Sequence, residues 1–134
     1  YVCSQCTGAI AASMVIKLLF PASIFLGGTI PSGSCIQSFI LEIFLTFFLM
    51  MVILRVATGS KEQGLFAGIA IGSVVLLEAM FAGPVSGASM NPARSLAPAI
   101  ISGNTASLWI YLSAPVIGAV TAVFIHKLIK PNQQ

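Results

Sequence analysis

The segment 87–95 constrains the fold most strongly, because it places a helix start and a lone arginine between segments apolar enough to span a membrane. Asn91 can cap a helix whose first residue is Pro92, since proline loses no hydrogen bond at that position. A helix over residues 92–101 rises only about 15 Å, roughly half of an approximately 30 Å hydrocarbon core. We therefore predict a half-helix whose positive dipole end points into the membrane. A charge kept at such a depth, here Arg94, indicates a functional site.

Composition independently indicates a membrane protein. Apolar residues make up 57% of the chain and charged residues 7%, and the mean hydropathy is +1.04, whereas soluble domains contain roughly 25% charged residues. The net charge is +3, but the six basic residues are scattered and several flank apolar runs, which is typical of topology signals and not of nucleic-acid binding. With one histidine and no aspartate, the chain lacks a catalytic set, a phosphate loop and a metal-ligand cluster. We therefore expect neither an enzyme nor a bound cofactor or metal.

Four segments are predicted to span the bilayer, at residues 1–20, 35–56, 65–81 and 108–129. Gly83 and Pro84 are expected to end the third span and to begin a re-entrant segment that runs to Ser107. We expect non-helical backbone over residues 81–90. At membrane depth such backbone must be buried in protein or line a watery cavity, and the second option makes a pore plausible.

Basic residues orient the predicted spans, because cytoplasmic loops are enriched in lysine and arginine. The loop 57–64 and the C-terminus are therefore expected to be cytoplasmic in a multi-pass membrane protein. The start of the last span is expected to act as an interfacial anchor through two aromatic side chains, and its end carries a histidine that we expect at the cytoplasmic interface. The basic residues on this side are Arg55, Lys61, Lys127 and Lys130, and the opposite loops hold no fixed charge except the nearby Lys17. The aromatic residues are Trp109 and Tyr111, and the histidine is His126.

The segment FAGPVSGASMNPARSLAPA at residues 81–99 resembles the second Asn-Pro-Ala loop of the aquaporin (major intrinsic protein) family. The sequence of this segment is most similar to that of the corresponding segment in plant nodulin-like intrinsic proteins. Two further patterns are similar to the family's third and fourth helices, namely Tyr1-x-x-x-Gln5-x-x-Gly8-Ala9 and Glu42-x-x-x-Thr46-Phe47. The resemblance covers essentially the whole chain. It implies an all-α membrane fold, an aquaporin-like helical bundle that is partial, with four transmembrane helices and one re-entrant half-helix.

Members of that family have six spanning helices and two Asn-Pro-Ala half-helices arranged as an inverted repeat. Residues 1–134 are therefore expected to form one partial channel domain, corresponding to the third to sixth helices, without the first two helices and the first half-helix. The implied function is a passive channel for water and small uncharged solutes, glycerol-like or metalloid-acid-like, in a homotetramer within the lipid bilayer. The alternative is a non-conducting truncated membrane protein that associates with full-length relatives. A secondary transporter would need ionisable groups at mid-membrane, where Glu42 is the single candidate.

The resemblance implies that Asn91, Pro92 and Ala93 form the pore motif. The Asn91 amide would donate to the passing solute, and the helix dipole behind it would disfavour cations, as in aquaporin-type pores generally. Pro92 and Ala93 would fix the geometry of the half-helix tip. The alternative for Asn91 is a helix cap with no further role.

By the same resemblance, Arg94, Ala88 and Ala79 belong to the selectivity filter. The Arg94 guanidinium would offer five donors to a solute and repel cations, whereas a salt bridge to Glu78 or Glu42 is the alternative. Water-selective members typically carry a histidine at the position of Ala79. This filter should therefore be wider and more apolar.

Two glutamates fall within predicted spans, where an unsatisfied carboxylate is costly. In the family, the glutamate that matches Glu42 accepts hydrogen bonds from the backbone of the re-entrant loop, so we assign Glu42 a structural role. Glu78 departs from the family pattern, in which a neutral residue is usual. We expect Glu78 to reach the outer interface; the alternatives are a place at the pore mouth or a pair with Arg94.

Overall fold

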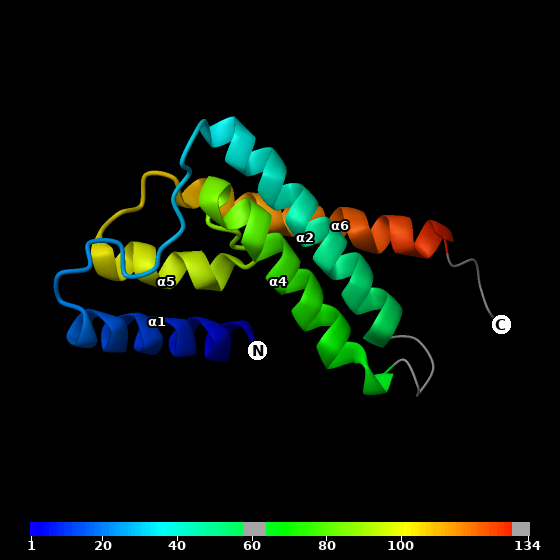
Figure 1. Cartoon of the computed structure of the whole chain (residues 1–134), viewed down its shortest axis with the longest axis horizontal. Coiled ribbons are helices and arrows are strands. Elements are labelled where there is room, and N and C mark those ends of the chain that lie inside the picture. The colour runs from blue at the N-terminus through cyan, green and yellow to red at the C-terminus, as the bar shows by residue number, and fades with distance from the viewer. Residues whose placement is uncertain (58–63, 130–134) are drawn as a thin grey trace.

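A computed structural model describes residues 1–57 and 64–129 of the chain. Five α-helices longer than ten residues lie in these ranges, and no strand does (Figure 1). They are α1 (Val2–Leu19), α2 (Cys35–Ala57), α4 (Ala67–Ser86), α5 (Pro92–Ser102) and α6 (Leu108–Ile129). The part of the orientation prediction that rests on Lys61 and Lys130 lies outside the described residues.

The predicted all-α architecture is confirmed. Helices α1, α2, α4 and α6 contain 18, 23, 20 and 22 residues, and each is long and apolar enough to cross a membrane. Helix α5 contains 11 residues, which corresponds to a rise of about 16 Å and crosses only about half of the hydrocarbon core. Residues 1–57 and 64–129 therefore contain four helices that are long enough to span a membrane and one half-helix.

The prediction that the third span ends near Phe81 is wrong, because α4 continues past Pro84 to Ser86. Proline inside a helix removes one backbone hydrogen bond and usually weakens the helix. Here the helix end is stabilised from outside, since the Tyr111 hydroxyl donates to the carbonyl oxygen of Ser86 at 2.6 Å. The non-helical backbone between α4 and α5 is consequently confined to residues 87–91.

Helix α2 lies at the centre of the bundle and packs on both α6 and α4. Gly118 of α6 faces α2 so closely that a Cβ atom there would overlap the carbonyl oxygen of Ile43 and lie 3.0 Å from the backbone nitrogen of Phe47. Small residues commonly allow such close approach between membrane helices. On the side of α4, Leu45 of α2 and Ala82 of α4 belong to a buried apolar cluster.

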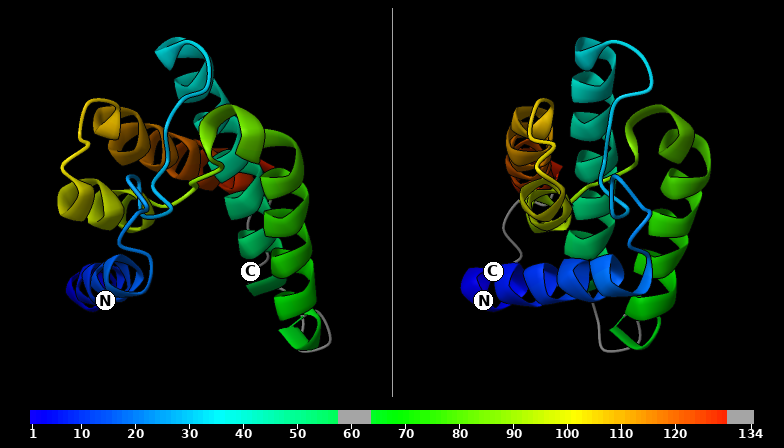
Figure 2. Two further views of the ribbon diagram at one scale, coloured as in Figure 1. Left: turned by 60° about the vertical axis from the view of Figure 1, so that its left-hand side comes forward. Right: turned by 90° about the vertical axis from the view of Figure 1, so that its left-hand side faces the viewer.

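Helix α1 packs against α5 and makes no comparable contact with the other described helices. Figure 2 shows α1 and α5 set apart from the α2–α4 pair. The Lys17 ammonium group donates to the carbonyl oxygen of Ile101 at 3.4 Å. A positive charge is thereby placed at the negative end of the α5 dipole, where it is stabilising.

Large apolar side chains are exposed over the surface of the spanning helices. Leu18 of α1, Leu76 of α4 and Leu128 of α6 are among many such residues. Monomeric soluble proteins rarely expose contiguous apolar patches of this extent. Exposed apolar side chains on long apolar helices are expected for a multi-pass membrane protein.

Candidate functional site

The turn between α4 and α5 forms the centre of the candidate site. Three of its residues have a positive backbone φ angle, namely Gly87 at 84°, Ala88 at 43° and Met90 at 52°. Glycine adopts this region freely, whereas alanine and methionine rarely do, at a cost of about 1–3 kcal/mol each. Such backbone persists when surrounding contacts enforce it, and it is concentrated at functional sites.

Glu42 of α2 provides those contacts. Its side chain is fully buried. One carboxylate oxygen, Oε1, accepts hydrogen bonds from the Ser86 hydroxyl at 2.7 Å and from the Ser89 backbone N–H at 2.9 Å. The other, Oε2, accepts from the Met90 backbone N–H at 2.9 Å. Hydrogen bonds to a charged group each contribute about 1.5–3 kcal/mol, so three of them offset the burial of the carboxylate and hold the turn against α2.

A row of three hydroxyl groups connects the same turn to α5 and to the loop after α1. The Thr29 hydroxyl donates to the Ser95 hydroxyl at 2.7 Å, and the Ser95 and Ser89 hydroxyls are hydrogen-bonded to each other. The Ser89 hydroxyl donates to the carbonyl oxygen of Asn91 at 2.9 Å. These three residues were not predicted from the sequence to belong to the site. The sequence does place two serines, Ser89 and Ser95, on either side of the Asn-Pro-Ala motif, and this pattern could have indicated them. No sequence pattern indicated Thr29.

Tyr111 of α6 completes the support of the turn. It is fully buried, and its hydroxyl donates to the carbonyl oxygen of Ser86, which has no partner within α4 because it lies in the last turn of that helix. The prediction that Tyr111 forms an interfacial anchor is therefore wrong. Trp109 is half-exposed and contacts the Phe39 ring, with 5.5 Å between the ring centroids.

Asn91 is the N-cap of α5, and Pro92 occupies the first helical position, as predicted from the sequence. The Asn91 side-chain oxygen Oδ1 accepts a hydrogen bond from the backbone N–H of Ala93 at 2.9 Å. This bond fixes the side-chain amide, and it leaves the Nδ2 hydrogens as donors. Ala93 is buried at the same helix tip.

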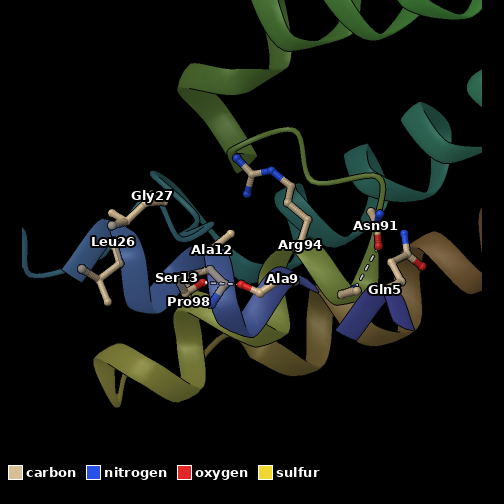
Figure 3. Close-up of a pocket in the computed structure, with 11 residues that line it drawn as sticks. Gln5, Ala9, Ala12, Ser13, Leu26, Gly27, Asn91, Arg94 and Pro98 are labelled. Atoms are coloured by element: carbon tan, nitrogen blue, oxygen red, sulfur yellow. Dashed lines mark hydrogen bonds between the residues drawn. The ribbon is translucent and has the colours of Figure 1, made fainter. Parts of the chain in front are cut away.

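Asn91 and Arg94 line one cleft of about 350 Å³ between α1 and α5 (Figure 3). Helix α1 contributes Gln5 and a row of small side chains, and the loop after α1 contributes Leu26 and Gly27. The side-chain nitrogens of these two residues are donors, the neutral Nδ2 group of Asn91 and the positively charged guanidinium of Arg94. Within residues 1–57 and 64–129, no group of three or more His, Cys, Asp and Glu side chains gathers as a metal site would require.

The other two predicted filter residues lie outside this cleft. Ala79 is exposed on α4, and Ala88 is buried against Leu45 and Ala82. Neither alanine is among the residues that line the cleft. The structure therefore brings Asn91 and Arg94 together but does not bring Ala79 and Ala88 to them.

Arg94 forms no ion pair with Glu42 or Glu78 within the described part of the chain, so the salt-bridge alternative is not observed there. The expectation that Glu78 reaches the outer interface is wrong. Its side chain is only 4% exposed because the Glu78 position on α4 faces α2. A sequence pattern alone does not say which face of a wholly apolar helix meets a neighbour.

A sequence model of the family described as Major intrinsic protein (MIP) matches residues 1–126. The chain belongs to the major intrinsic protein family. It is 48% identical to nodulin-26 of Glycine max over 131 residues, which cover 97% of this chain and 48% of that protein. It is 47% identical to Aquaporin NIP1-1 of Zea mays over 131 residues (97% and 46%) and 42% identical to Aquaporin NIP3-1 of Arabidopsis thaliana over 143 residues (100% and 44%).

These matches confirm the resemblance to the nodulin-like branch of the family, whose members are helical membrane channels and not enzymes. The chain spans about half the length of the curated relatives it matches. It contains one Asn-Pro-Ala motif, at residues 91–93.

Proposed function

We propose that this protein forms part of the wall of a passive pore for water and small uncharged solutes. The observation that carries the proposal is the Asn91 side chain. Its Oδ1 atom is engaged by the N–H of Ala93, so its Nδ2 group is held as a donor at the cleft. A solute oxygen that has lost part of its hydration shell needs such a donor, because an unpaired polar group is costly away from water.

Arg94 supports the same function from one turn further along α5. Its guanidinium provides up to five N–H donors in a fixed geometry and carries a positive charge. Together with the positive end of the α5 dipole, this charge disfavours cations and leaves neutral solutes as the favoured cargo.

We further propose that the filter around Arg94 is wide and weakly polar because Ala79 and Ala88 occupy two of its positions; this rests on the family match of residues 1–126, since neither alanine lines the cleft between α1 and α5. Both side chains are single methyl groups, so neither obstructs a solute larger than water. Solutes with several hydroxyl groups, such as glycerol or a metalloid acid, match an arginine donor beside an apolar wall.

The proposed domain assignment is that α1, α2, α4 and α6 are the family's third to sixth helices and that α5 is its second half-helix. The proposed assembly is a homotetramer.

Figure 1 supports the proposed orientation, because the C-terminal ends of α2 and α6 lie on one side of the molecule and the C-terminal end of α1 on the other. The first two ends carry Arg55 and Lys127 and the α1 end carries Lys17, so the excess of basic residues lies on the side proposed as cytoplasmic.

A graft tests the proposal. The segment of maize Aquaporin NIP1-1 that matches this chain would be replaced by residues 1–134 and the product reconstituted in vesicles. Stopped-flow swelling should show water and glycerol permeation well above that of protein-free vesicles, and Asn91→Leu should reduce both at least fivefold. Asn91→Asp, which keeps the cap acceptor but has no amide donor, is the matched variant. If it conducts like the unmodified graft, the donor role of Asn91 is refuted.

A further inference from the structure

The loop between α1 and α2, residues 20–34, is hydrogen-bonded to both sides of the turn that leads to Asn91. On the α4 side, the backbone N–H and the hydroxyl of Ser32 both donate to the carbonyl oxygen of Val85, at 2.9 and 3.0 Å. On the α5 side, the Thr29 hydroxyl donates to the Ser95 hydroxyl at 2.7 Å. Figure 1 shows this loop passing beside α5 before it reaches α2. The loop is therefore placed to influence how the turn is held.

Thr29 touches the turn but not the candidate solute path. A Cβ atom on Gly87 would lie 3.0 Å from Cγ2 of Thr29 and 3.1 Å from its Cα and Cβ atoms, so the loop and the turn are in close contact there. Thr29 is not among the residues that line the cleft of Asn91 and Arg94. An effect of Thr29 on a solute in that cleft must therefore act through other residues.

The hydroxyl row of Thr29, Ser95 and Ser89 provides such a connection. A hydroxyl has a single proton to donate. Because Thr29 donates to Ser95, all contacts of the row are satisfied only when Ser95 donates to Ser89 and Ser89 donates to the carbonyl oxygen of Asn91. The Ser89 hydroxyl also accepts from the Asn91 N–H at 3.4 Å. The row therefore ends on both backbone groups of the residue whose amide faces the cleft.

Ser95 has a competing acceptor, and Thr29 decides against it. Ser95 lies four residues after Asn91 in α5, and a serine within a helix can turn its hydroxyl to the carbonyl oxygen four residues earlier. In that arrangement Ser95 takes the acceptor that Ser89 uses. The two serines are buried, with 2% and 4% of their surface exposed, so bulk water does not replace the Thr29 donor. The contact from Thr29 thus keeps Ser95 directed to Ser89.

We propose that Thr29 is a positioning residue of the pore, whose hydroxyl acts through Ser95 and Ser89 to fix the Asn91 backbone and with it the direction of the Asn91 amide. The inference rests on the proposed role of Asn91 as a donor to the solute. A solute with several hydroxyl groups must meet several fixed donors at once, whereas water is small and reorients freely. Loss of the Thr29 hydroxyl therefore impairs glycerol permeation more than water permeation.

Solid-state NMR of residues 1–134 in phosphatidylcholine vesicles tests the structural step without conduction. Residues 91 and 92 are the single Asn-Pro pair in the sequence, so asparagine labelled with ¹³C at the carbonyl and proline labelled with ¹⁵N isolate the Asn91 carbonyl signal. Thr29→Val keeps the shape of the side chain without its hydroxyl and should move this signal by at least its line width. Thr29→Ser restores the hydroxyl and should leave the signal in place. Ser32→Ala, which removes a loop hydroxyl outside the row, should leave it in place as well.

Two results of this measurement would overturn the proposal. One is a signal that does not move in Thr29→Val. The other is a signal that moves as far in Thr29→Ser or Ser32→Ala as in Thr29→Val, since the displacement would then not depend on the hydroxyl of the row.

Permeation through the NIP1-1 graft tests the functional step. The ratio of glycerol to water permeability does not depend on how many channels are folded, so a change that only destabilises the protein leaves it unaltered. Thr29→Val and Ser95→Ala should each lower this ratio at least threefold, and Thr29→Ser should preserve it. The double variant should show no lower ratio than Ser95→Ala alone, because both substitutions interrupt one row.

An unchanged ratio in Thr29→Val, or losses that multiply in the double variant, would contradict the proposal. A graft that conducts neither solute before any of these substitutions would instead refute the proposed function. In that case the Asn91 carbonyl signal still decides whether Thr29 positions Asn91.

Discussion

The Oε2 atom of Glu42 accepts a hydrogen bond from the backbone nitrogen of Met90 at a distance of 2.9 Å, across 48 positions of the sequence. This contact joins the middle of a spanning helix to a turn residue whose φ angle is 52°. Because Met90 immediately precedes Asn91, the buried carboxylate controls where the Asn-Pro-Ala motif begins. The orientation of the candidate pore residues therefore depends on a side chain that is itself buried away from the cleft.

Replacement of Glu42 tests this dependence. Glu42→Gln keeps the size of the side chain, but its amide NH₂ would face one of the N–H donors of the turn. We expect a loss of about 2–3 kcal/mol in the free energy of unfolding, since a hydrogen bond to a charged group is lost and a buried donor is left unpaired. Equilibrium unfolding in mixed detergent–SDS micelles measures this difference.

Thr46→Val is the matched control, because the Thr46 hydroxyl donates to the backbone carbonyl oxygen of Glu42 at 2.9 Å and not to the side-chain carboxylate. Its expected cost is about 0.5–1.5 kcal/mol, since one neutral hydrogen bond is lost. If Glu42→Gln is no more destabilising than Thr46→Val, the carboxylate does not hold the turn as described.

Gly118 provides a test of the packing between α2 and α6. Gly118→Ala should destabilise the protein by about 1–3 kcal/mol or more, because the new methyl group overlaps backbone atoms that cannot move independently of α2. Gly72→Ala in α4 is the control, since a Cβ atom there meets nothing within 4 Å; it should be neutral or stabilising by up to about 1 kcal/mol. The same unfolding assay compares them, and equal effects would argue against close α2–α6 contact.

Arg94 should determine the exclusion of cations. Arg94→Val in the NIP1-1 graft removes the fixed charge and shortens the side chain, so larger neutral solutes and small cations should permeate. Arg94→Lys keeps the charge and should continue to exclude cations. Solute swelling and ion-flux assays at equal protein density distinguish these outcomes, and an unchanged solute cut-off with no cation leak in Arg94→Val would refute the assigned role.

Ala79 should set the width of the filter. Ala79→His adds bulk and a hydrogen-bonding group, so glycerol permeation through the graft should fall at least fivefold more than water permeation. Met80→His is the control, because Met80 is exposed about 100° around α4 from Ala79 and should leave both rates unchanged. Equal losses of water and glycerol permeation in Ala79→His, with normal insertion, would indicate that Ala79 does not face the solute path.

The spans and the half-helix could be predicted because their signals are local. Apolar runs bounded by glycine and proline define the spans, and Asn91 followed by Pro92 defines the start of α5. The end of α4 could not be predicted, since Pro84 signals a helix end while the contact from Tyr111 that supports the helix comes from a distant part of the chain. Here a tertiary contact outweighs a local preference.

The polar residues of the site divide in the same way. Asn91 and Arg94 were found because the motif places them one turn apart on a short helix. Thr29 was not found, because its contact with Ser95 depends on the path of an irregular loop over 66 positions of sequence. The burial of Glu78 was missed because α4 is apolar on all sides, so its sequence does not reveal which face packs against α2.

Thiol modification at position 94 tests the central claim most directly, namely that the cleft containing Asn91 and Arg94 lines the path of the solute. In a cysteine-free graft, with Cys3, Cys6 and Cys35 replaced by serine, a bulky neutral methanethiosulfonate reagent would be applied to Arg94→Cys and to the exposed control Met80→Cys during stopped-flow swelling. We expect that modification reduces water flux at least fivefold in Arg94→Cys and leaves it unchanged in Met80→Cys. Complete modification of Arg94→Cys without loss of flux would contradict it.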